Sequence, residues 1–175
     1  MIEGKKIRLV ILEKHHLDDI VKGWNNPEMR KFLGGFIPQT REAEREWIES
    51  AQQQMKNRSS FFFVIEDLST SRFIGTVSLN AIDWLAKSSG IGIAIHSPQD
   101  WEKGYGFEAM QLTIDFAWKN LNLRRIDLSV YAFNARAKHV YEKLGFKEWG
   151  IAHQKHFIDG EYVDTHFLEI FRENE

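Results

Sequence analysis

The feature that most constrains this chain is a glycine-rich turn, Trp-Glu-Lys-Gly-Tyr-Gly-Phe at 101–107, that joins a strand pattern to a helix pattern. Before it, isoleucines alternate with small residues over 91–95, which is typical of a strand. After it, apolar residues recur every three or four positions over 107–121, which predicts an amphipathic helix. A glycine turn that opens a helix exposes backbone N–H groups, and the helix dipole favours negative charge there. The segment therefore predicts an anion site of the kind that binds phosphate.

The other segments alternate between the same two patterns. Further strands are expected at 6–12, 61–65, 73–79, 126–132, 150–157 and 162–170. Further helices are expected at 17–24, from the N-cap Thr40 to residue 55, and at 134–144. Asp159-Gly160 predicts a tight hairpin between the last two strands. Because no repeat, linker or shift in composition interrupts this order, we expect one mixed α/β domain over residues 1–175.

The composition restricts both the ligands and the compartment. A formal net charge of -2, with no long run of Lys or Arg, argues against nucleic acid as a direct ligand. The absence of cysteine excludes disulfides, thiolate metal sites and a cysteine nucleophile, and it suits a reducing compartment. The N-terminus has no signal-peptide pattern, and no apolar run approaches the roughly 20 residues that span a bilayer. We therefore expect a cytoplasmic protein with no membrane partner.

A second segment, residues 134–146, complements the glycine turn. It follows the strand pattern at 126–132, and Asn134 stands where a helix N-cap is expected. Tyr141 lies two helical turns after Asn134, so that both side chains can share one face. If the strands at 91–95 and 126–132 are neighbours, their carboxyl ends and both helix starts face one cleft, where open α/β sheets bind ligands.

These two segments resemble the signatures of the GNAT superfamily of acyl-CoA N-acyltransferases. Residues 103–106 resemble the end of its pyrophosphate loop, Arg/Gln-x-x-Gly-x-Gly/Ala, and residues 134–146 resemble its second motif. Within the superfamily the chain is most similar to the RimJ/RimL branch, the N-terminal acetyltransferases of ribosomal proteins and their relatives. Residues 101–109, Asn25-Asn26-Pro27 and the closing segment 157–162 carry this resemblance.

The resemblance implies a GNAT fold and acetyl-CoA as the acyl donor. The fold class is α/β (α+β), with a mixed, mostly antiparallel sheet of six to seven strands, a V-shaped parting between the fourth and fifth strands, and four flanking helices. The implied reaction is direct attack of a primary amine on the thioester in a ternary complex, with no metal. The acceptor stays open between a protein N-terminal amine, a polyamine and a small amine metabolite, and a homodimer is an expected assembly.

The resemblance also assigns residues to the coenzyme and the acceptor. Backbone groups of Ile93, Ala94 and Ile95 would pair with the pantetheine amides, and the Ile95 N–H would stabilise the developing oxyanion. The remaining coenzyme-binding residues would be Trp101, Lys103, Gly104, Tyr105, Gly106, Phe107, Asn134, Lys138 and Tyr141. Phe32 and Phe36, in a glycine-bearing loop, are expected to contact the acceptor.

The catalytic groups are less completely defined by the sequence. Tyr141 is expected to be the general acid, because a phenol stays protonated at neutral pH and can donate to a departing thiolate. The base stays open between His96, Glu108 and a chain of water molecules, since Ser89-Gly90 stands where a carboxylate often precedes the fourth strand's Ile-Gly-Ile. Trp101 also departs from the usual Arg or Gln.

Two alternatives compete with an enzyme of this kind. The missing carboxylate at Ser89-Gly90 would suit a non-catalytic acyl-CoA-binding regulatory module on the same fold, whereas Tyr141 argues against it. A plain structural domain would bind no coenzyme. The histidine pair His153 and His156 does not indicate a metal site, because an offset of three residues puts the two side chains on opposite faces of a strand.

Overall fold

The computed structural model describes residues 1–35 and 37–173, and within them eight strands form one sheet in the order β1-β2-β3-β4-β5-β6-β8-β7. The strands are β1 (Ile2–Glu3), β2 (Ile7–Ile11), β3 (Phe61–Asp67), β4 (Phe73–Asp83), β5 (Ser88–Ile95), β6 (Arg125–Tyr131), β7 (Lys147–Ile158) and β8 (Glu161–Phe171). The helices are α1 (Leu17–Trp24), α2 (Pro27–Arg30), α3 (Arg41–Lys56), α4 (Tyr105–Lys119) and α5 (Ala135–Lys143), with short 3-10 turns η1 (Lys14–His16) and η2 (Pro98–Asp100). No helix among these described residues is both long and apolar enough to cross a membrane.

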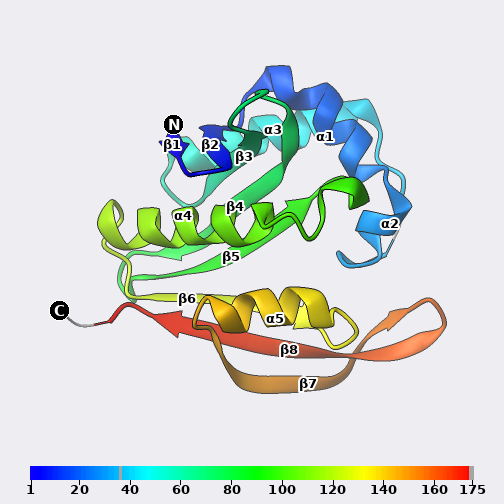
Figure 1. The fold of residues 1–175 in the computed structure, drawn as a ribbon. Coiled ribbons are helices and arrows are strands. Elements are labelled where there is room, and N and C mark those ends of the chain that lie inside the picture. The colour runs from blue at the N-terminus through cyan, green and yellow to red at the C-terminus, as the bar shows by residue number, and fades with distance from the viewer. Residues whose placement is uncertain (36, 174–175) are drawn as a thin grey trace.

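Helices cover both faces of the sheet (Figure 1). Because side chains alternate along a strand, Ile7 and Leu9 of β2 join the larger core cluster under α4, whereas Leu12 joins the smaller one under α1 and α3. The helix α5 lies on the α4 face, where its Tyr141 packs against the same cluster. The sheet therefore separates one layer that holds α4 and α5 from another that holds α1 and α3.

The expected fold class is confirmed, with two differences in the number of elements. An additional strand, β1, pairs antiparallel with β2 through Ile2 and Leu9, which gives eight strands instead of six to seven. An additional helix, α2, follows Asn26, whose side chain accepts hydrogen bonds from the Glu28 and Met29 N–H groups. Asparagine at the N-cap and proline at the first helical position are start signals that also occur in simple turns, so four residues were too few to indicate a helix.

The parting between two neighbouring strands is the feature that positions the site. The strands β5 and β6 run parallel, but only 88–90 of one pairs with 125–127 of the other. Beyond Gly90, β5 stays paired with β4 on one side, and β6 pairs with β8 along its full length. The residues 91–95 therefore have an unpaired edge, which is the V-shaped parting that the resemblance implied between the fourth and fifth predicted strands (Figure 1).

A tight contact between α1 and β5 gives a test of the fold. A Cβ on Gly23 of α1 would lie 1.7 Å from Nδ1 of His96, which follows β5. We expect Gly23→Ala to lower the free energy of unfolding by about 1–3 kcal/mol, because overpacking outweighs the gain of about 0.5–1 kcal/mol that alanine brings to a helix. Gly150→Ala is the control, since nothing lies within 4 Å of its Cβ position. Urea unfolding at pH 7 would contradict the packing if both variants changed stability equally.

Candidate active site

The glycine turn is held in place by a buried carboxylate. Asp100, at the end of η2, is buried and receives two hydrogen bonds from the Arg72 guanidinium, at 2.7 and 2.8 Å. These hydrogen bonds hold the pKa of the Asp100 carboxyl below its usual range, so the ion pair stays charged at neutral pH. Gly104 is the N-cap of α4 with a φ of 85°, a left-handed conformation that glycine adopts without strain. The turn therefore presents the first N–H groups of α4 in a fixed position.

The unpaired edge of β5 presents a defined set of backbone groups. The His96 N–H donates to the Ile74 carbonyl on β4 at 3.0 Å. Because backbone groups alternate in direction along a strand, Ala94 also faces β4, whereas Ile93 and Ile95 face the parting. The register therefore disfavours the expectation that Ala94 pairs with the coenzyme, since its hydrogen-bonding groups face the β4 ladder. The Ile95 carbonyl accepts a 3.0 Å hydrogen bond from the Trp101 indole, which leaves the Ile95 N–H and both groups of Ile93 for a ligand.

On the other side of the parting, α5 begins as the sequence predicted. The Asn134 side chain accepts a hydrogen bond from the Ala137 N–H at 3.3 Å, which is an N-cap interaction. Tyr141 packs edge-on against Phe146, with ring centroids 6.1 Å apart. Burial raises the pKa of the Tyr141 phenol to about 12, so this group carries its proton at neutral pH. The arrangement is compatible with a proton donor at this position.

The structure disfavours His96 as the general base. Its ring is only 5% exposed and packs against Trp24 and Phe73, with ring centroids at 5.8 and 5.0 Å. Burial lowers the pKa of His96 to about 4, because a charged imidazolium would lose its hydration there. A histidine that acts as a base carries a positive charge after it takes a proton, and the apolar surroundings of His96 oppose that charge.

Glu108 and Lys138 already have partners in the structure. The Glu108 carboxylate accepts hydrogen bonds from the backbone N–H groups of Lys5 and Lys6, so it fastens the N-terminal turn to α4. The Lys138 ammonium forms a 2.7 Å ion pair with Glu148, which directs it toward β7. These contacts make Glu108 a poor candidate for the base, and the coenzyme role of Lys138 stays a prediction.

The other predicted coenzyme residues lie in and after the glycine turn. The Lys103 ammonium is 3.3 Å from Asp100, and the Tyr105 hydroxyl donates to Asp67 at 3.1 Å, so the Tyr105 side chain points toward the turn between β3 and β4. Gly106 lies in the first turn of α4, where a Cβ would be in ordinary contact with Ile93, 3.8 Å away. Phe107 follows it in the same turn and is partly buried. Because the Lys103 and Tyr105 side chains already have partners, the backbone N–H groups are the donors of this segment that can bind an anion.

An aromatic cluster joins the carboxyl ends of the two parting strands. Phe32 comes from the segment after α2. The centroid of its ring lies 5.7 Å from that of Trp101 and 5.9 Å from that of Phe133, which follows β6. Phe133 stacks on Tyr131 at 5.4 Å, and the Arg136 guanidinium lies 4.0 Å above the Trp101 ring. Phe32, predicted to contact the acceptor, is therefore at the open end of the parting, whereas Phe36 lies outside the described residues. Phe133 was missed, because one aromatic residue after a strand carries no recognisable signal.

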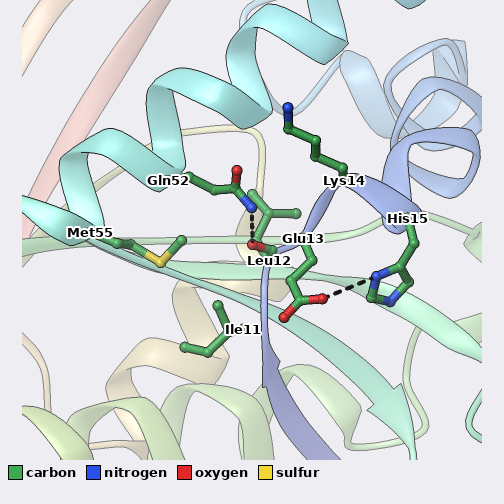
Figure 2. A pocket seen from close by; sticks show the side chains of 7 residues that line it. All are labelled: Ile11, Leu12, Glu13, Lys14, His15, Gln52 and Met55. Atoms are coloured by element: carbon green, nitrogen blue, oxygen red, sulfur yellow. Dashed lines mark hydrogen bonds and ion pairs between the residues drawn. The ribbon is translucent and has the colours of Figure 1, made fainter.

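Two cavities lie outside the parting. Figure 2 shows one of about 490 Å³ at the end of β2, lined by Glu13, His15, Gln52 and Met55 among others, and it contains no predicted site residue. The other, of about 800 Å³, adjoins the glycine turn and shares Glu102, Lys103 and Tyr105 with it.

The histidines of β7 have separate partners. His153 pairs with Asp164 at 3.0 Å, and the His156 ring packs edge-on against Tyr131. Within the parts of the chain that the structure describes, no three His, Cys, Asp or Glu side chains are grouped to hold a metal ion.

Comparison with known proteins agrees with this geometry. A family model described as "Acetyltransferase (GNAT) domain" matches residues 6–147. A spermidine N(1)-acetyltransferase of Vibrio cholerae is 29% identical over 169 residues, which cover 97% of this chain and 95% of that protein. The probable N-acetyltransferase YjcK of Bacillus subtilis is 33% identical over 132 residues, which cover 75% of this chain and 72% of that protein. A crystal structure of the Vibrio cholerae spermidine N-acetyltransferase in complex with CoA and spermine superposes with a TM-score of 0.85, at 27% identity and 96% coverage of both chains.

The parted sheet, the glycine turn at the start of α4 and the family match define an acyltransferase that uses coenzyme A. The chain belongs to the GNAT acetyltransferase family and is an N-acetyltransferase that uses acetyl-CoA. The resemblance identified from the sequence is confirmed at the level of this family.

The buried state of His96 gives a test by pH. Because the unfolded chain takes up a proton near the ordinary His pKa of 6.5, whereas the folded protein does so only near 4, stability falls as the pH decreases between these values. We expect His96 to account for a loss on the order of 2 kcal/mol by pH 5. Urea unfolding of the natural protein and of His96→Gln between pH 7 and pH 5 should therefore show a flatter profile for the variant. Parallel profiles, or an imidazole that titrates near pH 6.5 by NMR, would contradict this placement.

Proposed function

We propose that this N-acetyltransferase acetylates a primary amine of a polyamine by direct attack in a ternary complex. The observation that best supports acetyl transfer is the unpaired edge of β5 beside the glycine turn, because this edge offers backbone partners to an extended coenzyme arm. The polyamine acceptor is supported by relatives named spermidine N-acetyltransferases that cover nearly the whole chain. The RimJ/RimL branch, a protein N-terminal acceptor and a homodimer stay predictions from the sequence.

The residues present fit a coenzyme arm that enters the parting. In this proposal Ile93 and Ile95 pair through their backbone with the amides of the arm, and the N–H groups from Gly104 to Phe107 bind its diphosphate. Bound acetyl-CoA supplies the thioester that the amine attacks. The Ile95 N–H then donates to the oxygen on which negative charge develops. Asn134 holds the start of α5 against the other side of the arm.

Tyr141 is the general acid of this proposal. Its pKa of about 12 keeps the phenol protonated at neutral pH, so that it can donate to the departing thiolate. Its position on α5, across the parting from the β5 edge, suits a leaving group that lies between the two strands.

For the base, we propose that the amine loses its proton to water. Ser89 stands where a carboxylate often occurs, and its hydroxyl donates to the carbonyls of Asn80 and Gly90. Glu108 holds the N-terminal turn, and His96 is buried and hard to charge. In this proposal, water at the open end of the parting therefore accepts the proton of the amine.

Tyr141→Phe tests the general acid. We expect kcat to fall by about 10²–10⁴-fold, because the leaving thiolate loses its proton donor. The affinity for acetyl-CoA should stay nearly unchanged, since the ring keeps its packing against Phe146. Thiol release gives kcat and calorimetry gives the affinity. A variant with natural turnover would remove Tyr141 from the mechanism.

A panel of amines tests the acceptor class. We expect kcat/KM for spermidine and spermine to exceed that for a peptide with a free N-terminal amine by about tenfold or more. Faster acetylation of the peptide would favour the RimJ/RimL interpretation. Binding of acetyl-CoA without thiol release to any amine would favour the non-catalytic module that Ser89-Gly90 suggests.

A further inference from the structure

We propose that the cavity beside the glycine turn binds the 3′-phosphate of the coenzyme's nucleotide, and this inference rests on the proposed function. The cavity of about 800 Å³ is large enough for part of a nucleotide. Beside Leu68 and Ser69, it is lined by three lysines, two carboxylates and a tyrosine: Lys5, Lys6, Lys103, Asp67, Glu102 and Tyr105. Three of these belong to the turn that would bind the diphosphate, so the cavity is continuous with that site.

Lys6 brings its charge directly to the turn. Its ammonium donates to the Lys103 carbonyl at 2.9 Å, and a Cβ on Gly104 would lie 3.4 Å from the same nitrogen. An ammonium group has three donors, and this contact uses one of them. Two donors therefore remain for an anion beside Gly104.

The N-terminal turn that carries these lysines is fastened to α4. The backbone N–H groups of Lys5 and Lys6 both donate to the carboxylate of Glu108, in the first turn of the helix. Because this interaction uses the backbone, both side chains stay available to a ligand. The position of the lysines relative to the diphosphate site is thus set before a ligand binds, which lowers the entropic cost of binding.

The charges around the cavity favour an anion. The Asp67 carboxylate accepts five hydrogen bonds, four from Ser69 and Thr70 and one from the Tyr105 hydroxyl. These donors hold the pKa of Asp67 far below its usual range and disperse its negative charge within the turn. Glu102 is exposed and opposes an anion, and the Lys103 ammonium is paired with Asp100, so Lys5 and Lys6 supply the excess positive charge. The net charge around the cavity is therefore positive.

The 3′-phosphate is the group that fits this position. The diphosphate is already provided for by the N–H groups of the turn, and coenzyme A carries one further phosphate, on the ribose that follows the diphosphate. A doubly charged phosphate beside ammonium groups forms charge-assisted hydrogen bonds, which are stronger than neutral ones. Dephospho-CoA differs from CoA only in that phosphate, so the pair of ligands isolates the contact.

The test compares CoA with dephospho-CoA by calorimetry on the natural protein and on the double variant Lys5→Met and Lys6→Met. Methionine keeps the apolar stem of lysine and removes its charge. We expect the natural protein to bind CoA about tenfold more tightly than dephospho-CoA, as one charge-assisted hydrogen bond would give. The double variant should lose this preference while its affinity for dephospho-CoA changes little. Lys56→Met, at the end of α3 and outside the cavity, is the control and should keep the preference.

Two results would overturn the inference. The double variant could bind CoA and dephospho-CoA more weakly by the same factor and keep its preference for CoA. In that case Lys5 and Lys6 only support the shape of the turn. If the natural protein shows no preference, the cavity does not recognise the 3′-phosphate. Failure of the natural protein to bind either ligand would instead refute the proposed function, so the two failures are distinguishable. Thermal melting of each variant checks that it remains folded.

Discussion

The site depends on the early end of the pairing between β5 and β6. Only three residue pairs join the two strands, and beyond Gly90 the backbone of β5 has a partner on one side only. Unpaired backbone groups are costly when buried, and an open strand edge inside a sheet is unusual. The structure meets part of this demand through the Trp101 indole, which donates to the Ile95 carbonyl. The remaining groups of Ile93 and Ile95 are directed into the parting.

Several distant segments hold the glycine turn beside this edge. Arg72, just before β4, fixes the buried Asp100 ahead of the turn, and Glu108, just after the turn, fastens the N-terminal residues to α4. The aromatic contacts of Phe32 and Phe133 connect the turn to both flanking segments. The position of the N–H groups of the turn relative to β5 therefore depends on residues outside the turn.

Local patterns were sufficient for most of the fold. The alternation over 91–95 and the helical spacing after residue 107 depend on side-chain periodicity, which does not require knowledge of the partner. Thr40 and Asn134 are N-caps as expected, because a capping side chain bonds to N–H groups two or three residues away. The short strand β1 was not predictable in this way, because two residues cannot show a period.

The chemical environment of the site residues was harder to predict. His96 follows a strand that borders the site, which suggested a base, yet α1 packs over it and buries it. Ala94 was grouped with Ile93 and Ile95, although the direction of its backbone groups depends on the register with β4. The ammonium of Lys6 reaches the turn from a segment 97 residues away in sequence, a contact that no local pattern contains.

By itself, the sequence determined the order of the longer elements, the glycine turn, both capping residues and the resemblance to the GNAT superfamily, since each of these is encoded within a few consecutive residues. Only the tertiary structure decided which backbone groups face the parting, which ionisable groups are buried or already paired, and which lysines surround the turn. Burial, strand register and charge all depend on segments that meet only after folding, and for that reason they are absent from any local pattern of residues.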